Sequence, residues 1–388
     1  MPHEQTDGTT RRRLTVLQVL PALESGGTER GVLEVAEALV AAGHRSLVIS
    51  AGGRMAVQLT EQGSEHFIRR LGTKSPLTLC HLPWLRRFLL EQNVDVIDIH
   101  SRMPGWIAFA AWKSLPARRR PALISTVHGF YSVNSYSSIM CRGQHVVAVS
   151  DSVADYIRQN YCFVPDGRLH VIHRGIDRAE FPRGFQPAIA WEKDFFGQFP
   201  AAVNKKILAI VGRISRLKGH LDFIRLVGEL RVHDQDIHGL IVGDVDPRKT
   251  AYQEEIRQMI ATLGLHDHIT LTGHRSDVRE IYSISRIVLC LSSTPESFGR
   301  TVAEAIAIGT PVVGYSHGGV AEILAAAFPD GAVECQNFGA LTARVCELLG
   351  RPDLCIPGVN RFEKSVMLQR TLELYESASE QRNSSRRS

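Results

Sequence analysis

A strand, a loop, a helix and a second strand follow one another in the sequence IVLCLSSTPESFGRTVAEAIAIGTPVVGY, residues 287–315. Short apolar, β-branched runs at 287–291 and 311–315 flank a stretch with helical spacing at 300–308, which is the pattern of a βαβ unit. The same alternation continues on both sides of this segment. The sequence therefore predicts an α/β protein with parallel sheets.

Two series of these units can be read along the chain. The first predicts strands at residues 14–20, 45–51, 95–101, 122–128, 145–150 and 169–174, and the second at residues 206–212, 238–243, 269–272, 287–291 and 311–315. Between the series, residues 184–204 are rich in Gly, Pro and aromatic residues and are typical of a linker with a short helix. The pattern predicts two doubly wound, Rossmann-like domains that face a common cleft, where such folds bind ligands.

These boundaries predict four segments. Residues 1–13 are polar and are expected to form a disordered tail, and residues 14–200 form an N-terminal domain that includes the linker from about residue 184. Residues 201–355 form a C-terminal domain. Residues 356–388 supply a last amphipathic helix, at 362–377, and a frayed tail.

The composition is that of a globular protein. The 388 residues are 44% hydrophobic and 22% charged, which excludes fibrous and disordered classes. No apolar run approaches the roughly 20 residues that span a bilayer, and the amino terminus lacks the apolar core of a signal peptide. The seven cysteines are scattered without a CxxC pair, which indicates neither a disulfide framework nor a zinc site. We therefore expect a cytoplasmic protein.

The positive charge is confined to the first half of the chain. Residues 1–200 hold 23 Lys and Arg against 18 Asp and Glu, whereas residues 201–388 hold 22 of each. Arginine clusters lie near tryptophans, as at Arg118–Arg120 after Trp112. This mixture suits an anionic membrane surface or an anionic acceptor, although solvated faces beside core aromatics would also produce it. The basic residues form no dense stripe, so we expect no nucleic-acid partner.

Two cations follow the first strand of the second series. The sequence VGRISRLKGH, residues 211–220, places Arg213 at the strand end and Lys218 five residues later. At the carboxyl edge of a parallel sheet, two cations can grip a diphosphate and stabilise the charge that builds on it as a leaving group. The alternative is a pair of solvated loop cations.

Two carboxylates occur in the segment quoted first. Glu296 lies in the loop and Glu304 about one turn into the helix, so they could hold hydroxyls of two different sugar rings. Ser297, Phe298 and Gly299 offer backbone amides at the helix start, where the helix dipole favours an anion. As alternatives, Glu304 would be a solvated helix-face residue, and Glu296 a carboxylate stabilised by the dipole.

A diglycine precedes the first helix of the chain. Gly26 and Gly27 would let the backbone approach a phosphate closely. The nucleotide fingerprint GxGxxG is absent, and a diglycine is also an ordinary turn.

With GGTER at 26–30, VGR and KG within 211–219, and PESFGR at 295–300 followed by Glu304, the sequence resembles glycosyltransferase family 4. Members of that family are retaining enzymes with the GT-B fold that use nucleotide-sugar donors. The similarity covers about residues 14–350 in the correct order.

The resemblance implies a role for each residue that matches a family motif. Arg213 and Lys218 would bind the donor diphosphate, Glu304 the ribose hydroxyls and Glu296 the transferred sugar. The amides of 297–299 would lie near the sugar and phosphate, and Gly26 and Gly27 would close on the donor from the first domain.

Details of the first half are similar to bacterial enzymes of lipopolysaccharide core assembly, including the mannosyltransferase group. The matching segments are SGGTERGVLE at 25–34, HSRMPGW at 100–106, TVHGFY at 126–131 and VIHRGID at 171–177. This likeness implies that His274 and Arg275 edge the base pocket and that His128 lies near the donor sugar. Arg102 and Tyr131 would contact the acceptor. A lone histidine such as His128 is also commonly a structural residue.

The residues and the resemblance together predict a retaining hexosyltransferase with His128, Arg213, Lys218 and Glu296 as its catalytic set. The donor would be GDP-mannose or a UDP-sugar, and the acceptor a saccharide or lipid-linked glycan such as the lipopolysaccharide core. The sequence offers no clear carboxylate nucleophile, which favours same-face attack as the diphosphate leaves. Because the paired cations already supply the charge of a metal ion, we expect no metal and no other cofactor.

Two further expectations complete the prediction. The basic first domain predicts a peripheral contact with the inner face of the cytoplasmic membrane.

The alternative functions are a catalytically inactive sugar-nucleotide-binding protein, which would have lost a cation or a carboxylate, and a nucleotide-sugar epimerase, which would not need these four charged residues.

Overall fold

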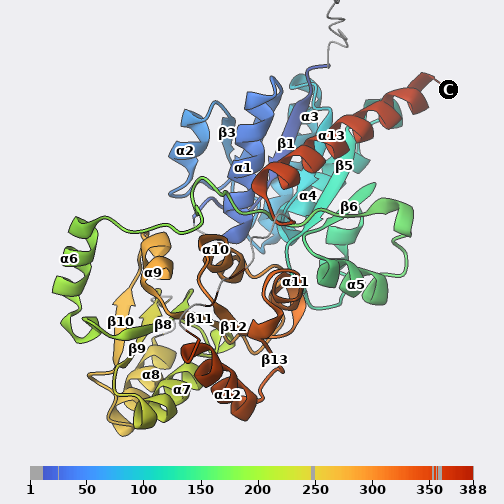
Figure 1. Ribbon diagram of the computed structural model, residues 1–388. Helices are drawn as coiled ribbons and strands as arrows, with labels where there is room; N and C mark the ends of the chain where they lie inside the picture. Colours follow the sequence, from blue (N-terminus) through green and yellow to red (C-terminus); the bar gives the residue numbers. More distant parts are fainter. Residues whose placement is uncertain are drawn as a thin grey trace, which may run out of the picture. The chain divides into compact units, whose positions relative to one another are not determined.

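The computed structural model describes residues 12–24, 26–245, 250–351, 354, 356 and 361–387. The predicted tail at 1–13 therefore lies almost wholly outside the described residues. The chain folds as two compact units, whose elements are labelled in Figure 1. Unit 1 comprises residues 1–148, 156–172 and 368–388, and unit 2 comprises residues 149–155 and 173–367.

Unit 1 contains a parallel sheet of seven strands in the order β3-β2-β1-β4-β5-β6-β7. The central strands are buried along nearly their whole length, as expected for a parallel sheet covered on both faces. The strands are β1 (Thr15–Val19), β2 (Arg45–Ser50), β3 (Glu65–Ile68), β4 (Val96–Ile99), β5 (Ala122–Val127), β6 (His145–Ala148) and β7 (Leu169–Val171).

Helices connect these strands as the crossover of a parallel sheet requires. They are α1 (Gly27–Ala41), α2 (Ala56–Glu61), α3 (His81–Glu91), α4 (Arg102–Lys113), α5 (Asp151–Asn160) and the last helix, α13 (Lys364–Arg387), with 3-10 turns η1 (Pro76–Cys80), η2 (Ala117–Arg119), η3 (Ser137–Cys141) and η4 (Asp166–Arg168). The boundaries between the units fall at 148/149, just before α5, at 155/156 within α5, at 172/173, just after β7, and at 367/368 within α13.

Unit 2 contains a parallel sheet of six strands in the order β10-β9-β8-β11-β12-β13. Its strands are β8 (Lys206–Val211), β9 (Ile237–Val242), β10 (Ile269–Gly273), β11 (Ile287–Cys290), β12 (Val312–Tyr315) and β13 (Ala332–Val333). Its helices are α6 (Ile189–Gln198), α7 (His220–His233), α8 (Ala251–Thr262), α9 (Val278–Ile284), α10 (Arg300–Ile308), α11 (Gly318–Ala327) and α12 (Phe338–Leu349), with 3-10 turns η5 (Pro200–Ala202), η6 (Arg216–Lys218) and η7 (Pro329–Gly331).

Strand order decides which loops become neighbours. In unit 2, β8 pairs with both β9 and β11, so the loops after β8 and β11 leave the same edge of the sheet side by side. In unit 1, β4 pairs with both β1 and β5, so the loops after β4 and β5 are also adjacent. Both pairs lie at carboxyl ends of strands, where open α/β sheets bind their ligands.

The structure confirms the predicted α/β fold with two doubly wound, Rossmann-like parallel sheets, but the boundaries differ from the prediction. Residues 184–204 were predicted as a linker of the first domain, whereas α6 packs in unit 2 through the buried Phe195. The segment expected to fray after residue 377 is helical to Arg387 and belongs to unit 1. Among the described residues, no helix combines the length and the apolar character needed to cross a bilayer.

Candidate active site

A tight turn in unit 2 fixes the position of Lys218. The chain leaves β8, forms η6 and reaches Gly219, which has a left-handed conformation with φ of 75°. A Cβ atom at Gly219 would lie 2.0 Å from the carbonyl oxygen of Leu291, immediately after β11. Only glycine can make this approach, and it brings Lys218 beside the loop that carries Glu296.

Lys218 and Glu296 form an ion pair. The Lys218 Nζ atom lies 2.5 Å from Glu296 Oε1, and the two side chains are 31% and 17% exposed. The Ser292 hydroxyl donates to the same oxygen. Burial alone would lower the pKa of Lys218 and raise that of Glu296, but their mutual attraction reverses both shifts. Both groups are therefore charged at neutral pH.

Some polar atoms around this ion pair have no hydrogen-bond partner among the described residues. No side chain or backbone group among the described residues donates to Glu296 Oε2. The Arg213 side chain is exposed and near enough to Lys218 to lower the pKa of that lysine, and it makes no hydrogen bond or ion pair with the described part of the chain. Two cations against one carboxylate leave one positive charge in this loop, which suits an anionic ligand.

The start of α10 adds backbone donors to this site. Gly299 is the N-cap residue with φ of 90°, and a Cβ there would lie 2.9 Å from the side chain of Val320. Within the described residues, no acceptor is found for the backbone N–H groups of Ser297, Phe298 or Gly299. The helix dipole makes this terminus positive, so the amides and Arg213 together can receive an anion.

The side chain of Glu304 is buried and is not a solvated carboxylate on the face of the helix. Its side chain is 7% exposed, Tyr282 donates to Oε2 at 3.0 Å, and Arg300 lies 3.9 Å from Oε1. The structure thus replaces the predicted solvated alternative with a buried, hydrogen-bonded carboxylate, and the ribose role remains a prediction.

His274 and Arg275, predicted at the base pocket, have different surroundings. Arg275 forms a bidentate ion pair with Asp277, donates to Gln198 and lies over the rings of Phe195 and Phe199. His274 is exposed. Of the two, His274 is therefore the freer to contact a ligand.

In unit 1, the diglycine lies at the start of α1, as predicted. Gly26 is the N-cap residue and Gly27 the first helical residue. No atom of the described residues lies within 4 Å of where a Cβ of Gly27 would be. This space is compatible with the close approach of a ligand to the helix terminus.

His128 is half-buried and hydrogen-bonds to a chain formed by the buried His100 and Gln18. Its Nε2 atom is 2.9 Å from Nδ1 of His100, and Nε2 of His100 is 3.1 Å from Oε1 of Gln18. The amide nitrogen of Gln18 donates to the carbonyl of Val32, so its oxygen must accept. In a neutral His100, Nε2 therefore carries the proton and Nδ1 accepts from His128. Sequence reasoning missed His100, although it ends a predicted strand just as His128 does.

Arg102 and Tyr131 are brought together. The Arg102 guanidinium lies 5.1 Å from the ring centre of Tyr131 and 5.4 Å from that of Tyr136, and it donates to Ser137 at 3.3 Å. Burial raises the pKa of the Tyr131 hydroxyl, which the backbone of His128 hydrogen-bonds. Arg102 is thus held against Tyr131, whose hydroxyl contacts the backbone of His128.

One cluster in unit 2 has the composition of a metal site. Ligand atoms of Asp151, His173 and Glu322 lie within 4.8 Å of one another. However, the Glu322 carboxylate accepts from the first backbone N–H groups of α5, at Asp151 and Ser152, and Arg361 pairs with Asp151 at 2.7 Å. These contacts make the cluster a helix cap and ion-pair network.

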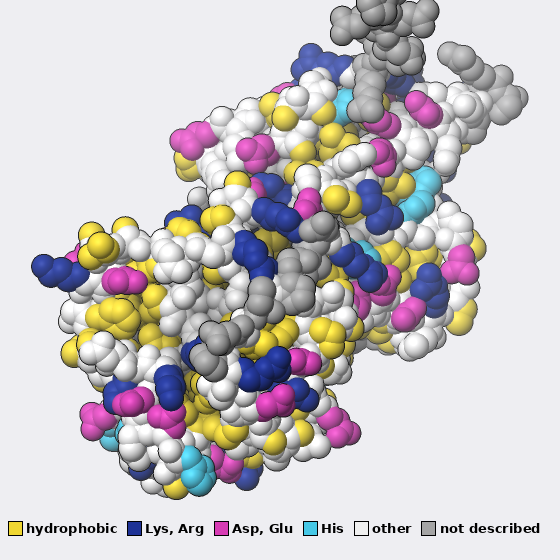
Figure 2. Space-filling view, viewed as in Figure 1, with side chains coloured by type: hydrophobic (Ala, Val, Ile, Leu, Met, Phe, Trp, Pro, Cys, Tyr) yellow, Lys and Arg dark blue, Asp and Glu magenta, His cyan; other side chains and the backbone are white. Residues whose placement is uncertain are grey.

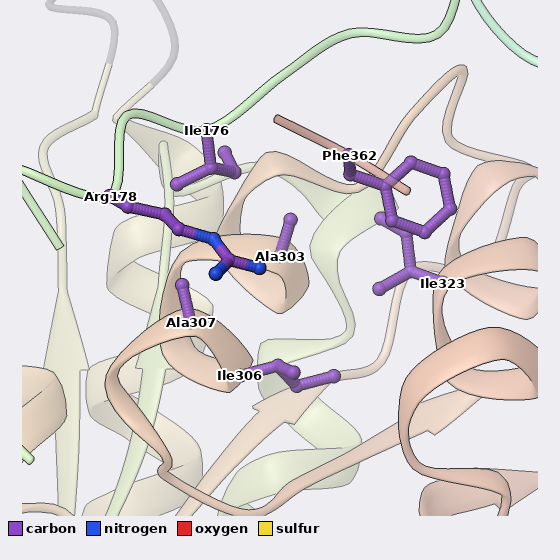
Figure 3. A pocket seen from close by; sticks show the side chains of 7 residues that line it. All are labelled: Ile176, Arg178, Ala303, Ile306, Ala307, Ile323 and Phe362. Carbon is purple, nitrogen blue, oxygen red and sulfur yellow. The ribbon is translucent and has the colours of Figure 1, made fainter. Parts of the chain in front are cut away.

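Two features bear on ligand class. A pocket of unit 2 behind α10 has a volume of about 20 Å³ and apolar walls from Ala303, Ile306 and Ala307 (Figure 3), which is room for about one water molecule and not for a nucleotide. On the face in Figure 2, lysine and arginine side chains are interspersed with acidic ones. The side chains drawn in colour there thus mix both charges, unlike the continuous basic stripe that binds nucleic acid.

Comparisons with known proteins identify both halves of the chain. Residues 25–180 match the model of "Glycosyltransferase Family 4", and residues 192–355 match that of "Glycosyl transferases group 1". N-acetyl-α-D-glucosaminyl L-malate synthase of Bacillus anthracis is 26% identical over 244 residues, which cover 60% of each chain. Two D-inositol 3-phosphate glycosyltransferases of Mycolicibacterium match over 33% and 40% of their own length, so the matches span less than two thirds of these relatives.

Solved structures agree with this result. A glycosyltransferase from Rickettsia africae is 28% identical with a TM-score of 0.83, over 94% of this chain and 98% of that one. Anabaena HepE, solved in complex with UDP and glucose, is 18% identical with a TM-score of 0.77, over 94% of this chain and 100% of that one. WaaG, described as a glycosyltransferase involved in lipopolysaccharide biosynthesis, is 14% identical with a TM-score of 0.65. The last two likenesses concern the fold.

Proposed function

Because the chain belongs to the family 4 glycosyltransferases and has the GT-B fold, we propose that it transfers a hexose from a nucleotide-sugar donor to a saccharide acceptor with retention of configuration. The observation that carries this proposal is the Lys218–Glu296 ion pair, near Arg213 and the amides of 297–299, which have no partner among the described residues. The cations and amides can bind a diphosphate. The Oε2 atom of Glu296, which has no donor among the described residues, can accept a hydrogen bond from a sugar hydroxyl.

The proposed transfer breaks one bond and forms one bond at the anomeric carbon. The bond between the anomeric carbon and the diphosphate breaks, a bond to the acceptor oxygen forms on the same face, and the acceptor's proton passes to the departing phosphate. Lys218 and Arg213 stabilise the negative charge that grows on the leaving group, while Glu296 orients the sugar. Glu296 already holds Lys218 and Ser292, so we assign it a positioning role and not that of a covalent nucleophile.

We assign the two substrates to the two units. Unit 2 would hold the donor, which is GDP-mannose or a UDP-sugar, with Glu304 and His274 on the nucleoside. In unit 1, His128, Arg102 and Tyr131 would act near the transferred sugar and the acceptor, which we propose to be the lipopolysaccharide core or a related lipid-linked glycan. The transfer would need no divalent ion, because fixed cations already face the leaving group.

A peripheral contact with an anionic membrane surface remains part of the proposal, but most predicted arginine–aromatic groups have another explanation. Arg69 lies 4.5 Å from the ring centre of Trp84, and Arg120 lies 4.9 Å from that of Trp112. These arginines stack on their own unit. The side chains of Arg118 and Arg119 have no such partner among the described residues, and they are the better candidates for the contact.

A thermal-shift experiment tests the donor assignment. The purified protein is melted with GDP, UDP, ADP and CMP sugars, with and without EDTA, since a ligand at 100 times its dissociation constant stabilises by about 2.7 kcal/mol. A shift with GDP or UDP sugars that EDTA leaves unchanged supports the proposal. A shift that EDTA abolishes would contradict the metal-free assignment. If no nucleotide sugar shifts the wild type even with a saccharide acceptor added, the donor site itself is wrong.

A further inference from the structure

A polar cavity lies in unit 1, at the opposite end of β4 from His100. Its volume is about 390 Å³, and its lining includes Leu89, Asp95 and four arginines, Arg12, Arg118, Arg119 and Arg382. Asp95 directly precedes β4, whereas His100 directly follows it. The cavity is therefore separate from the groups that we assign to the transfer reaction.

Asp95 organises two of the arginines. Its Oδ1 atom accepts from Arg12 at 2.8 Å and from Arg382 at 3.2 Å, and its Oδ2 atom accepts from the backbone N–H of Thr15 at 3.0 Å. The Asp95 and Arg382 side chains are only 8% and 13% exposed. The carboxylate is thus fully occupied, and it holds guanidinium groups from two distant segments of the chain in fixed places.

Arg118 and Arg119 bring uncompensated charge to the cavity. They lie on the 3-10 turn η2, and their side chains make no ion pair or hydrogen bond with any described residue. The next residue, Arg120, behaves differently, since it donates to the carbonyl groups of Leu115 and Lys113. The lining thus holds four guanidinium groups and one carboxylate, and this excess of basic groups favours an anionic ligand.

We propose that this cavity binds the phosphate group of a ligand about the size of a sugar phosphate or a lipid headgroup. Guanidinium groups bind phosphate through paired N–H donors, and four of them converge here from three segments of unit 1. The volume exceeds that of a bare phosphate and falls within the range of small-molecule sites. A bound phosphate would also link the end of α13 to η2, because Arg382 belongs to the first and Arg119 to the second.

The proposal does not depend on the transfer reaction, and its test measures binding alone. The probes are inorganic phosphate, followed by isothermal titration calorimetry, and phosphatidylcholine vesicles with or without phosphatidylglycerol, followed by co-sedimentation. The test variant is Arg118→Ala/Arg119→Ala. The matched control is Lys193→Ala/Arg257→Ala, which removes the same charge from exposed positions of unit 2. Both variants alter exposed side chains, and the melting temperature checks that each is folded.

We expect the test variant to bind phosphate, phosphatidylglycerol vesicles or both at least tenfold more weakly than the control. A loss confined to inorganic phosphate identifies a soluble phosphate ester as the ligand, and a loss confined to vesicles identifies a lipid headgroup. The Arg118→Lys/Arg119→Lys variant should recover only part of the affinity, since lysine keeps the charge but not the paired donors. Equal binding by the alanine variant and the control, or no binding of either probe by the wild type, overturns the proposal.

Discussion

Lys218 and Glu296 are separated by 78 residues, yet they form the ion pair on which the proposed donor site depends. The sequence singles out both residues, because one follows a strand and the other lies in a loop before a helix. It does not show that they bond to each other, since that follows from β8 and β11 being neighbours and from Gly219 approaching Leu291. Each residue is therefore partly responsible for the charge state of the other.

The Lys218→Ala variant should lower kcat by about 10²–10³-fold. The lysine stabilises the leaving diphosphate, and its loss also leaves the Glu296 carboxylate buried without a cation, which will raise the pKa of that carboxyl group. Steady-state kinetics with the donor that the thermal-shift experiment identifies measure the effect. Lys193→Ala, which changes an exposed lysine, is the control. Near-normal kcat in a folded Lys218→Ala protein would contradict the role.

Glu304 requires a pair of variants, because its carboxylate has a structural partner. Glu304→Ala removes the acceptor of the buried Tyr282 hydroxyl and should cost about 1–3 kcal/mol of stability. Glu304→Gln keeps an acceptor for Tyr282, so its melting temperature should stay near that of the wild type while its dissociation constant for the donor rises. Unchanged donor affinity in the glutamine variant would leave Glu304 with a packing role alone.

The surroundings of other site residues could not be predicted from the sequence. Arg275 appears as a loop cation in the sequence, but Asp277 and two phenylalanine rings hold it in place. His128 appears alone, but a second histidine 28 residues away completes its hydrogen bond. Asp277 is a close neighbour in the sequence, but the two rings and the second histidine are brought there by packing of elements, for which a single sequence carries no signal.

At the level of elements, the start of α5 depends on a side chain from α11. Glu322 accepts the N–H groups of Asp151 and Ser152, so the carboxylate acts as a helix cap supplied from 170 residues away. Although burial would raise its pKa, the hydrogen bonds from His173 and from Ser152 lower the pKa of Glu322 to about 2. A lowered pKa means that the folded state is stabilised when this carboxylate is ionised.

This cap should give a pH-dependent stability. The contribution of Glu322 is fully present above its ordinary pKa of about 4.5 and is lost as the pH falls from there towards about 2. Its size is up to about 3 kcal/mol. Urea unfolding of the wild type and of Glu322→Gln should therefore differ most near pH 7, and the difference should shrink below pH 4.5. A difference that is constant with pH would show that the charge is irrelevant to the cap.

The strands show which elements the sequence can predict. Buried parallel strands such as β11 and the ILAIV stretch of β8 are continuous apolar runs and were predicted from that pattern. The edge strand β3 reads Glu-His-Phe-Ile with exposed ends, and β13 has two residues, so neither carries a clear pattern. Both are held in place by a neighbouring strand and not by their own composition.

At the level of the whole molecule, the two-sheet fold was predictable, but the course of the chain between the units was not. The prediction treated the C-terminal helix and tail as a separate segment, whereas residues 368–388 belong to unit 1. The reason is specific contacts. Tyr375 donates to Asp98 at 2.6 Å, and Arg382 donates to Asp95. These tertiary hydrogen bonds hold α13 on unit 1.

Removing residues 368–388 should weaken unit 1 alone. The deletion takes away the buried Leu374, Tyr375 and Ala378 and leaves two buried aspartates with fewer donors. Hydrogen–deuterium exchange should become faster in β4 and stay unchanged in β8. A shorter deletion, of residues 383–388, keeps Tyr375 and Arg382 and is the matched control. Equal protection of β4 in both deletions would contradict the assigned contacts.

The interleaved course of the chain also has a consequence for synthesis. A ribosome releases residues 1–148 first, but the helix that completes this unit is released only after the whole of 173–367. Unit 2 is nearly contiguous and can fold as it emerges. Unit 1 must wait with Asp95 and Asp98 still lacking their partners from α13. The first half of the protein to be made is therefore the last to be finished, and it is the half most exposed to chaperones and proteases while translation continues.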